Sequence, residues 1–114
     1  MKIWHNPRCS KSRATLKLLE DAGEEPEVRR YLEDPPSPKE LDAALRALGK
    51  EPWEIARLRE TVAKNLNMED WPEDRQRWID AMTTHPILIE RPIVFADDGR
   101  AVLGRPPENV EDLL

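Results

Sequence analysis

The order of strand-like and helix-like segments in the first 32 residues most constrains the fold of this chain. A strand-like segment at 2–5 is followed by an Asn6-Pro7 break and then by a helical pattern over 10–22. Proline fixes φ and disfavours helical backbone in the residue before it, so the helix is expected to begin after Pro7. A second strand is predicted over 27–32. A strand–helix–strand unit of this length implies two parallel strands joined by a right-handed crossover.

The helical pattern over 10–22 also predicts which side of the helix is buried. Ala14, Leu18 and Ala22 recur every four residues, with Thr15 and Leu19 beside them. Side chains spaced by four lie on one face of a helix, so this stripe is the predicted contact with the sheet.

The middle of the chain has the pattern of a helical insertion. Ser37 has the features of an N-cap, with Pro38 at the first helical position, Glu40 three residues on and Gly49 as the stop. Residues 52–82 then read as helix in two or three pieces.

The last part of the chain predicts a β-hairpin over 93–96 and 101–103, closed by a Gly-containing turn, and a short helix from Pro106 to Leu114. The summed order predicts an α/β fold with a mixed four-stranded sheet flanked by helices. The helical insertion, at about 38–84, separates the second and third strands. A chain of 114 residues is expected to form a single domain.

Composition excludes several classes of function. The 18 basic and 23 acidic residues give a net charge of −5, which argues against a broad nucleic-acid-binding surface. No apolar run is long enough to span a bilayer, and we expect a soluble, cytoplasmic protein. The single cysteine cannot form an internal disulfide. With only two histidines besides it, no metal site is expected.

The cysteine lies where a helix begins. Unpaired N–H groups and the helix dipole favour negative charge at that end, so a thiol there loses its proton more readily. Arg8, Lys11 and Arg13 add positive charge around Cys9, and His5 is close enough to contribute a hydrogen bond. The alternative is a buried, inert cysteine, which is common among free cysteines.

Cys9-Ser10-Lys11-Ser12 is a Cys-x-x-Ser arrangement. Ser12 occupies the position of the second cysteine in a dithiol oxidoreductase. Its hydroxyl could donate to a thiolate, or it could simply bond to its own helix backbone. It cannot form a disulfide, so any reductive cycle needs a second thiol from outside the chain.

The nonapeptide HNPRCSKSR, residues 5–13, is similar to the His-x3-Cys-x3-Arg signature of the glutaredoxin-dependent arsenate reductases. Residues 31–36, 85–94 and 104–108 also resemble blocks of that family, in the same order. The resemblance implies a thioredoxin-like fold and reduction of arsenate by Cys9. It also implies glutathione as co-substrate, glutaredoxin as partner and no bound cofactor. Within the nonapeptide, the expected supporting residues are His5, Asn6, Ser12 and Arg13.

The same resemblance matches Arg57, Arg91 and Arg105 to the family's three oxyanion-binding arginines, although a shift of two positions would select Arg59 instead. Planar guanidinium groups suit a tetrahedral oxyanion, and a solvated surface charge is the alternative for each of them. Arg91 and Arg105 each precede a proline, which favours extended backbone. Pro92 resembles the cis proline that faces the reactive cysteine in thioredoxin-like folds.

Two other functions remain open. The first is a related thiol oxidoreductase with another substrate, because the loop around Cys9 differs from that of some arsenate reducers. The second is a regulator like the Spx family, which shares this fold and contacts RNA polymerase. Many such regulators carry a Cys-x-x-Cys switch, which this chain lacks because of Ser12.

Overall fold

The computed structural model describes residues 1–114, which form two compact units. Met1–Asp34 and Arg91–Leu114 make up one of them, here called the sheet unit. Pro35–Glu90 makes up the other, here called the helical unit. The helical insertion expected at about 38–84 lies inside the helical unit. That the whole chain behaves as one domain stays a prediction.

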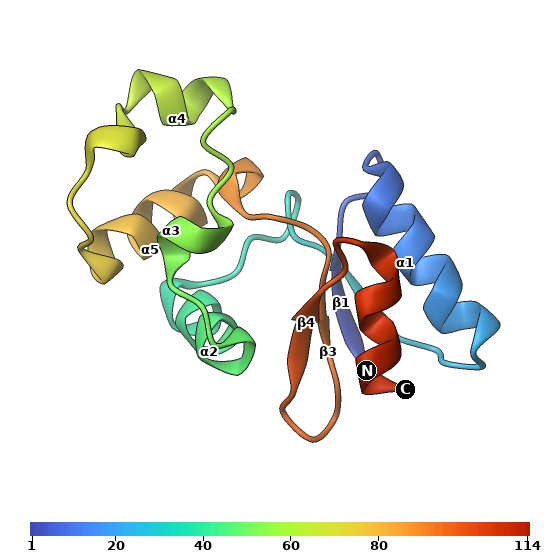
Figure 1. Ribbon diagram of the computed structural model, residues 1–114. Coiled ribbons are helices and arrows are strands. Elements are labelled where there is room, and N and C mark those ends of the chain that lie inside the picture. The colour runs from blue at the N-terminus through green and yellow to red at the C-terminus, as the bar shows by residue number, and fades with distance from the viewer. The chain divides into compact units, whose positions relative to one another are not determined.

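The sheet unit contains a four-stranded mixed sheet (Figure 1). Its strand order is β2-β1-β3-β4. β1 pairs in parallel with β2 and antiparallel with β3, and β3 pairs antiparallel with β4. The predicted strand–helix–strand unit and the predicted mixed sheet are therefore confirmed. The elements of this unit are β1 (Lys2–His5), α1 (Ser10–Asp21), β2 (Glu27–Arg30), β3 (Ile93–Phe95), β4 (Ala101–Leu103) and the 3-10 helix η3 (Pro107–Leu113).

Strand β2 is shorter than the sequence predicts. It ends at Arg30, whose carbonyl accepts the N–H groups of Glu33 and Asp34 at 3.0 and 2.9 Å. These bonds turn the chain away from the sheet at Tyr31, which is fully buried. The predicted extension of the strand to Leu32 is therefore wrong, because a turn uses the backbone groups that a longer strand would need.

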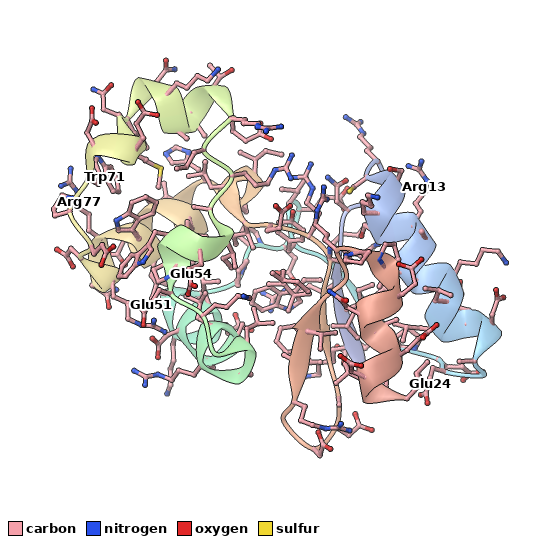
Figure 2. The ribbon with its side chains drawn as sticks, in the orientation of Figure 1. Arg13, Glu24, Glu51, Glu54, Trp71 and Arg77 are labelled. Carbon is pink, nitrogen blue, oxygen red and sulfur yellow. The ribbon has the colours of Figure 1, made fainter.

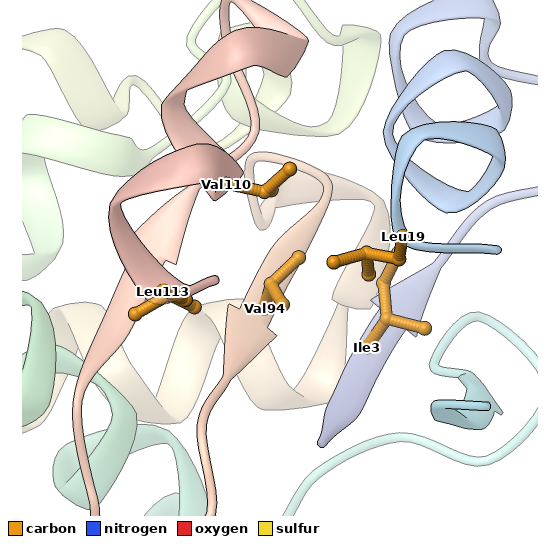
Figure 3. Packing of buried hydrophobic residues seen from close by; sticks show 5 residues of the cluster. All are labelled: Ile3, Leu19, Val94, Val110 and Leu113. Carbon is orange, nitrogen blue, oxygen red and sulfur yellow. The ribbon is translucent and has the colours of Figure 1, made fainter. Parts of the chain in front are cut away.

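The core of the sheet unit lies between the sheet, α1 and η3. Ile3 of β1 pairs with Val94 of β3, and both side chains are fully buried. Figure 3 shows them packed with one residue of α1 and two of η3. The buried cluster consists of Ile3, Leu19, Val94, Val110 and Leu113. Burying apolar surface in this way fixes α1, and with it the cysteine at its start, on the sheet.

The buried face of α1 differs from the predicted stripe. Its buried residues are Ser12, Thr15 and Leu19. Thr15 and Leu19 belong to the predicted stripe, and for them the prediction is confirmed. Ala14 and Ala22 are exposed and Leu18 is only half-buried, so for these three it is wrong. The apolar periodicity is not centred on this face because two of the three buried residues are polar. They are buried at low cost because their hydroxyls are hydrogen-bonded, one near His5 and the other to Gly104.

The C-terminal part of the sheet unit follows the sequence prediction. β3 and β4 form a hairpin whose turn contains Gly99 at φ 93°, a backbone region that favours glycine. The predicted terminal helix is present as a 3-10 helix that begins at Pro107. Figure 1 shows η3 beside α1.

The first helix of the helical unit has every terminal signal that its sequence predicts. The Ser37 side chain accepts the N–H of Glu40 at 3.1 Å, and the Glu40 carboxylate accepts the N–H of Ser37 at 3.0 Å. Pro38 occupies the first turn, and Gly49 ends the helix at φ 67°. The elements of this unit are α2 (Pro38–Leu48), α3 (Pro52–Ile55), α4 (Thr61–Asn65), η1 (Met68–Asp70), α5 (Arg75–Thr84) and η2 (Pro86–Leu88).

Residues 52–82 are divided into four helical pieces instead of the predicted two or three. The helix that begins at Pro52 stops at Ile55 because the next residue, Ala56, is extended and bridges to Ile89. The Arg57 N–H then donates to the Leu88 carbonyl at 2.8 Å. Backbone pairing with a segment about 30 residues away thus replaces the helical bonds that local sequence favours.

Candidate active site

The loop before α1 is held by Asn6, which is only 5% exposed. Its side-chain Oδ1 accepts the Arg8 N–H at 3.0 Å, and its main-chain carbonyl accepts the Cys9 N–H at 3.0 Å. The Arg13 side chain adds a bond from Nη1 to the Pro7 carbonyl at 3.0 Å. Asn6 and Arg13, both predicted as supporting residues, therefore shape the loop that delivers the cysteine.

Cys9 is the N-cap residue of α1, with extended backbone at φ −94° and ψ 122°. Its side chain is partly exposed. Burial by itself raises the pKa of this thiol. The backbone N–H of Ser12, the side chain of Arg91 and the backbone N–H of Lys11 outweigh that effect, so the pKa lies below its ordinary value. The thiolate is thus favoured at this position, as expected of a helix N-terminus.

The side chains of two arginines are hydrogen-bonded to the sulfur of Cys9. Arg105 donates from Nη1 to the Cys9 Sγ at 3.8 Å and to the Arg91 carbonyl at 3.3 Å. The Arg91 side chain lowers the pKa of the thiol through a hydrogen bond and through its charge. The structure therefore brings together three of the predicted site residues. They come from the N-cap of α1, the segment before β3 and the segment after β4.

Both arginines precede a cis proline. The Arg91–Pro92 bond is cis, as expected for the proline that enters the third strand. The Arg105–Pro106 bond is also cis, which the sequence analysis did not predict. The shared Arg-Pro pair was the only sequence signal for this similarity.

His5 and Ser12 form a buried pair behind the cysteine loop. The His5 Nδ1 and the Ser12 Oγ are 2.6 Å apart, and the Asn6 N–H donates to the same Oγ at 3.1 Å. The Ser12 oxygen thus accepts one bond from the Asn6 N–H and shares a second hydrogen bond with the His5 ring. Burial, and then the positive charges of Arg30 and Arg13, lower the pKa of His5 below its ordinary value. The Ser12 hydroxyl is thus bonded to His5, while the backbone N–H of Ser12 donates to the Cys9 sulfur.

Arg57 lies in the helical unit, between two carboxylates. Its Nη1 donates to Glu90 Oε1 at 2.7 Å, and its Nε donates to Glu60 Oε1 at 3.2 Å. Burial lowers the pKa of Arg57, but the two carboxylates raise it by more than burial lowers it. The net pKa is above the ordinary value, so the guanidinium stays charged. Arg59, the alternative in the sequence analysis, is exposed. Glu90 could not be predicted as the partner of Arg57, because 33 residues separate the two.

No group of three or more His, Cys, Asp or Glu side chains is arranged to hold a metal ion. None of the helices is both long and apolar enough to cross a membrane. The chemistry that Cys9, Arg91 and Arg105 offer is that of one activated thiol beside two guanidinium groups. Such groups stabilise negative charge on an oxyanion while a thiolate attacks it.

Comparison with known proteins gives matches over nearly the whole chain. The model of the ArsC family matches residues 4–113. The chain is 50% identical over 117 residues to an uncharacterized protein in the glnII region of Streptomyces viridochromogenes, covering 100% of this chain and 98% of that protein. It is 44% identical over 115 residues to an arsenate reductase of Neisseria meningitidis serogroup A, covering 100% and 97%.

Among solved structures, an arsenate reductase from Vibrio cholerae matches with a TM-score of 0.94 and 46% identity, over 99% of this chain and 96% of that one. A second, described as a putative arsenate reductase from Yersinia pestis, matches with a TM-score of 0.91 and the same identity, over 97% of each chain. The α/β thioredoxin-like fold that the resemblance implied is confirmed by these neighbours.

Proposed function

Because this chain belongs to the ArsC family, we propose that it reduces arsenate to arsenite with the Cys9 thiolate as nucleophile. The observation that carries this proposal is the convergence of Arg91 and Arg105 on the Cys9 sulfur, with the Arg105 Nη1 at 3.8 Å. A lowered pKa increases the fraction of the thiol present as the attacking thiolate, and adjacent guanidinium groups attract an oxyanion.

The first step is attack of the Cys9 thiolate on arsenic, which forms an S–As bond and expels hydroxide or water. A glutathione thiolate then attacks the Cys9 sulfur. The S–As bond breaks with its electron pair left on arsenic, which becomes arsenite, and a Cys9–glutathione disulfide forms. A glutaredoxin thiol removes the glutathione and restores the Cys9 thiol. Two thiols are thus oxidised to one disulfide for each arsenate reduced.

The chain has no second thiol, so this proposal needs one from outside it, and the family resemblance implies glutathione and glutaredoxin for that role. Ser12 stands where a resolving cysteine would be, and Cys9 is the only cysteine. A soluble dithiol system of this kind operates in the cytoplasm, which is where we place the reaction.

Oxyanion binding is proposed for Arg91 and Arg105 from their contacts with the sulfur and with each other. Arg57 is carried over from the family resemblance as a third ligand. In the helical unit its guanidinium is paired with Glu90 and Glu60, so an oxyanion has to compete with these carboxylates for it. Its contribution to binding is therefore expected to be smaller than those of the other two.

The test is NADPH-coupled arsenate reduction with glutathione and glutaredoxin, comparing the intact protein with Cys9→Ser. We expect Cys9→Ser to fall to the rate without protein, because serine is a far weaker nucleophile. Ser10→Ala is the matched control, since it alters an exposed neighbour of Cys9 and keeps the thiol. Substantial arsenate reduction by Cys9→Ser contradicts the mechanism.

A second candidate is a related thiol oxidoreductase with another substrate, favoured by the pairing of Arg57 with two carboxylates. Alkylation of Cys9 in the presence of arsenate, phosphate or sulfate distinguishes the two. Arsenate is expected to protect the thiol. Protection by none of the three anions points away from an oxyanion as substrate.

A further inference from the structure

The backbone of residues 103–105 is held by side chains and main chain from three other parts of the sheet unit. The Gly104 N–H donates to the Pro92 carbonyl at 2.9 Å. The Asn109 Nδ2 donates to the carbonyls of Leu103 and Arg105, both at 3.2 Å. Four backbone polar groups in three consecutive residues therefore have fixed partners once the Gly104 carbonyl is included.

That carbonyl is bound by Thr15, a fully buried residue of α1. The Thr15 Oγ1 donates to the Gly104 carbonyl at 3.2 Å, across 89 residues of sequence. It also lies 2.8 Å from the Lys11 carbonyl, the usual acceptor for a threonine in a helix. One hydroxyl hydrogen serves both acceptors as a shared bond. Thr15 thus joins the helix that begins at Cys9 to the residue before Arg105.

Gly104 has no space for a side chain against this threonine. A Cβ on Gly104 would lie 2.5 Å from the Thr15 Oγ1, 2.9 Å from its Cγ2 and 2.7 Å from the Pro92 Cγ. Glycine is therefore required for the chain to pass this close to α1. The chain at Gly104 thus lies close to α1 on one side and to Pro92 on the other, which leaves the backbone before Arg105 little room to move.

We propose that Thr15 and Asn109 are positioning residues that hold Arg105 with its guanidinium on the Cys9 sulfur. Neither side chain has a hydrogen bond to the sulfur; both act through the backbone next to Arg105. The inference rests on the proposed function, in which Arg105 acts on the nucleophile. Thr15 and Asn109 both lie outside the four segments that resemble the family, residues 5–13, 31–36, 85–94 and 104–108.

The test measures the rate of Cys9 alkylation by iodoacetamide as a function of pH, in buffer without arsenate. Thr15→Val keeps the shape of threonine and removes its hydroxyl, and Asn109→Ala removes both side-chain bonds. In each variant we expect the pH midpoint to rise and the rate at neutral pH to fall by about three-fold, equivalent to about half a pKa unit. Arg105→Gln is expected to give a larger decrease.

The decisive comparison is made in the Arg105→Gln background. There Thr15→Val and Asn109→Ala are expected to have no further effect on alkylation, because the group that they position is gone. Thr83→Val is the matched control. The Thr83 hydroxyl donates to the Ile79 carbonyl within its own helix at 3.0 Å, so its removal should leave the thiol unchanged.

An equal decrease with and without Arg105 would overturn the proposal, because it would mean that these residues act on α1 directly. Unchanged alkylation in both variants would overturn it as well. Thermal unfolding of each variant establishes that it is folded, and Asn109→Ala alone carries the test if Thr15→Val does not fold. Because no arsenate is used, a protein that fails to reduce arsenate can still pass, so the two proposals fail separately.

Discussion

Helices α1 and α2 have similar lengths, 12 and 11 residues, but they differ in the capping bonds and charged residues at their ends. α2 begins with a complete capping box between Ser37 and Glu40, carries Arg46 in its last turn and ends at Gly49 in the left-handed region. α1 begins at Cys9, which makes no side-chain capping bond. Its first turn contains no acidic residue and its last turn no basic one.

The charges of α1 run against the helix dipole. Lys11 and Arg13 lie in the first turn, whereas Glu20 and Asp21 lie in the last. Figure 2 shows Arg13 near the start of α1 and Glu24 near its other end. Positive charge at the start of a helix is unfavourable for its stability. Positive charge at the same place is favourable for a thiolate, so the charges that are unfavourable for the α1 helix suit an ionised Cys9.

If this comparison is correct, reversing a charge in the first turn should destabilise α2 and stabilise α1, and the change in the free energy of unfolding should be larger for α2. Glu40→Lys removes the bond from the Ser37 N–H and places a positive charge in the first turn of α2. We expect a loss of about 1–2 kcal/mol in the free energy of unfolding, from the lost capping bond and the dipole together. Urea denaturation measures it.

Glu25→Lys is the control for Glu40→Lys, because it makes the same change of charge at an exposed residue outside any helix. It is expected to alter the free energy of unfolding by less than about 0.5 kcal/mol. Equal losses in the two variants would show that net charge, and not the end of α2, is responsible.

The same reversal in α1 should stabilise the protein. Lys11→Glu places an acidic residue in the first turn, and we expect a gain of about 0.3–1 kcal/mol in the free energy of unfolding. The added negative charge raises the pKa of the Cys9 thiol, so alkylation near neutral pH should slow by about two- to three-fold. Lys2→Glu, on β1, is the control with the same change of charge. Faster alkylation of Cys9 in Lys11→Glu than in the unaltered protein would contradict this account of α1.

Features that depend on neighbours in sequence were predictable. The capping box of α2 follows from the spacing of Ser37 and Glu40, and the hairpin follows from Gly99 between two short strands. The position of Cys9 at the start of a helix follows from the Asn6-Pro7 break. In each case the atoms that decide the structure lie within a few residues of one another.

Features that depend on distant partners were not predictable from one sequence. The hydroxyl of the buried Thr15 bonds to a carbonyl 89 residues away, so apolar periodicity alone could not centre the buried face of α1 on this polar residue. The pairing of Arg57 with Glu90 is likewise invisible until the two segments bridge. A single arginine in a sequence gives no sign of whether carboxylates or a thiol will surround it.

The smallest expected effect concerns the residue that the proposed chemistry requires. Serine is a good N-cap because its oxygen accepts an N–H from the first turn, and Cys9 makes no such bond. Cys9→Ser should therefore raise the free energy of unfolding by about 0.5 kcal/mol while abolishing reduction.

The stability gained by Cys9→Ser should depend on pH. The folded thiol has a lowered pKa, so the native protein gains stability from the thiolate as the pH rises through that pKa toward the ordinary value. Chemical denaturation should thus show the largest advantage of the serine variant at mildly acidic pH, where the thiol is protonated, and a shrinking advantage above it. A serine variant that is less stable at acidic pH would mean that α1 has given up no stability at its first residue.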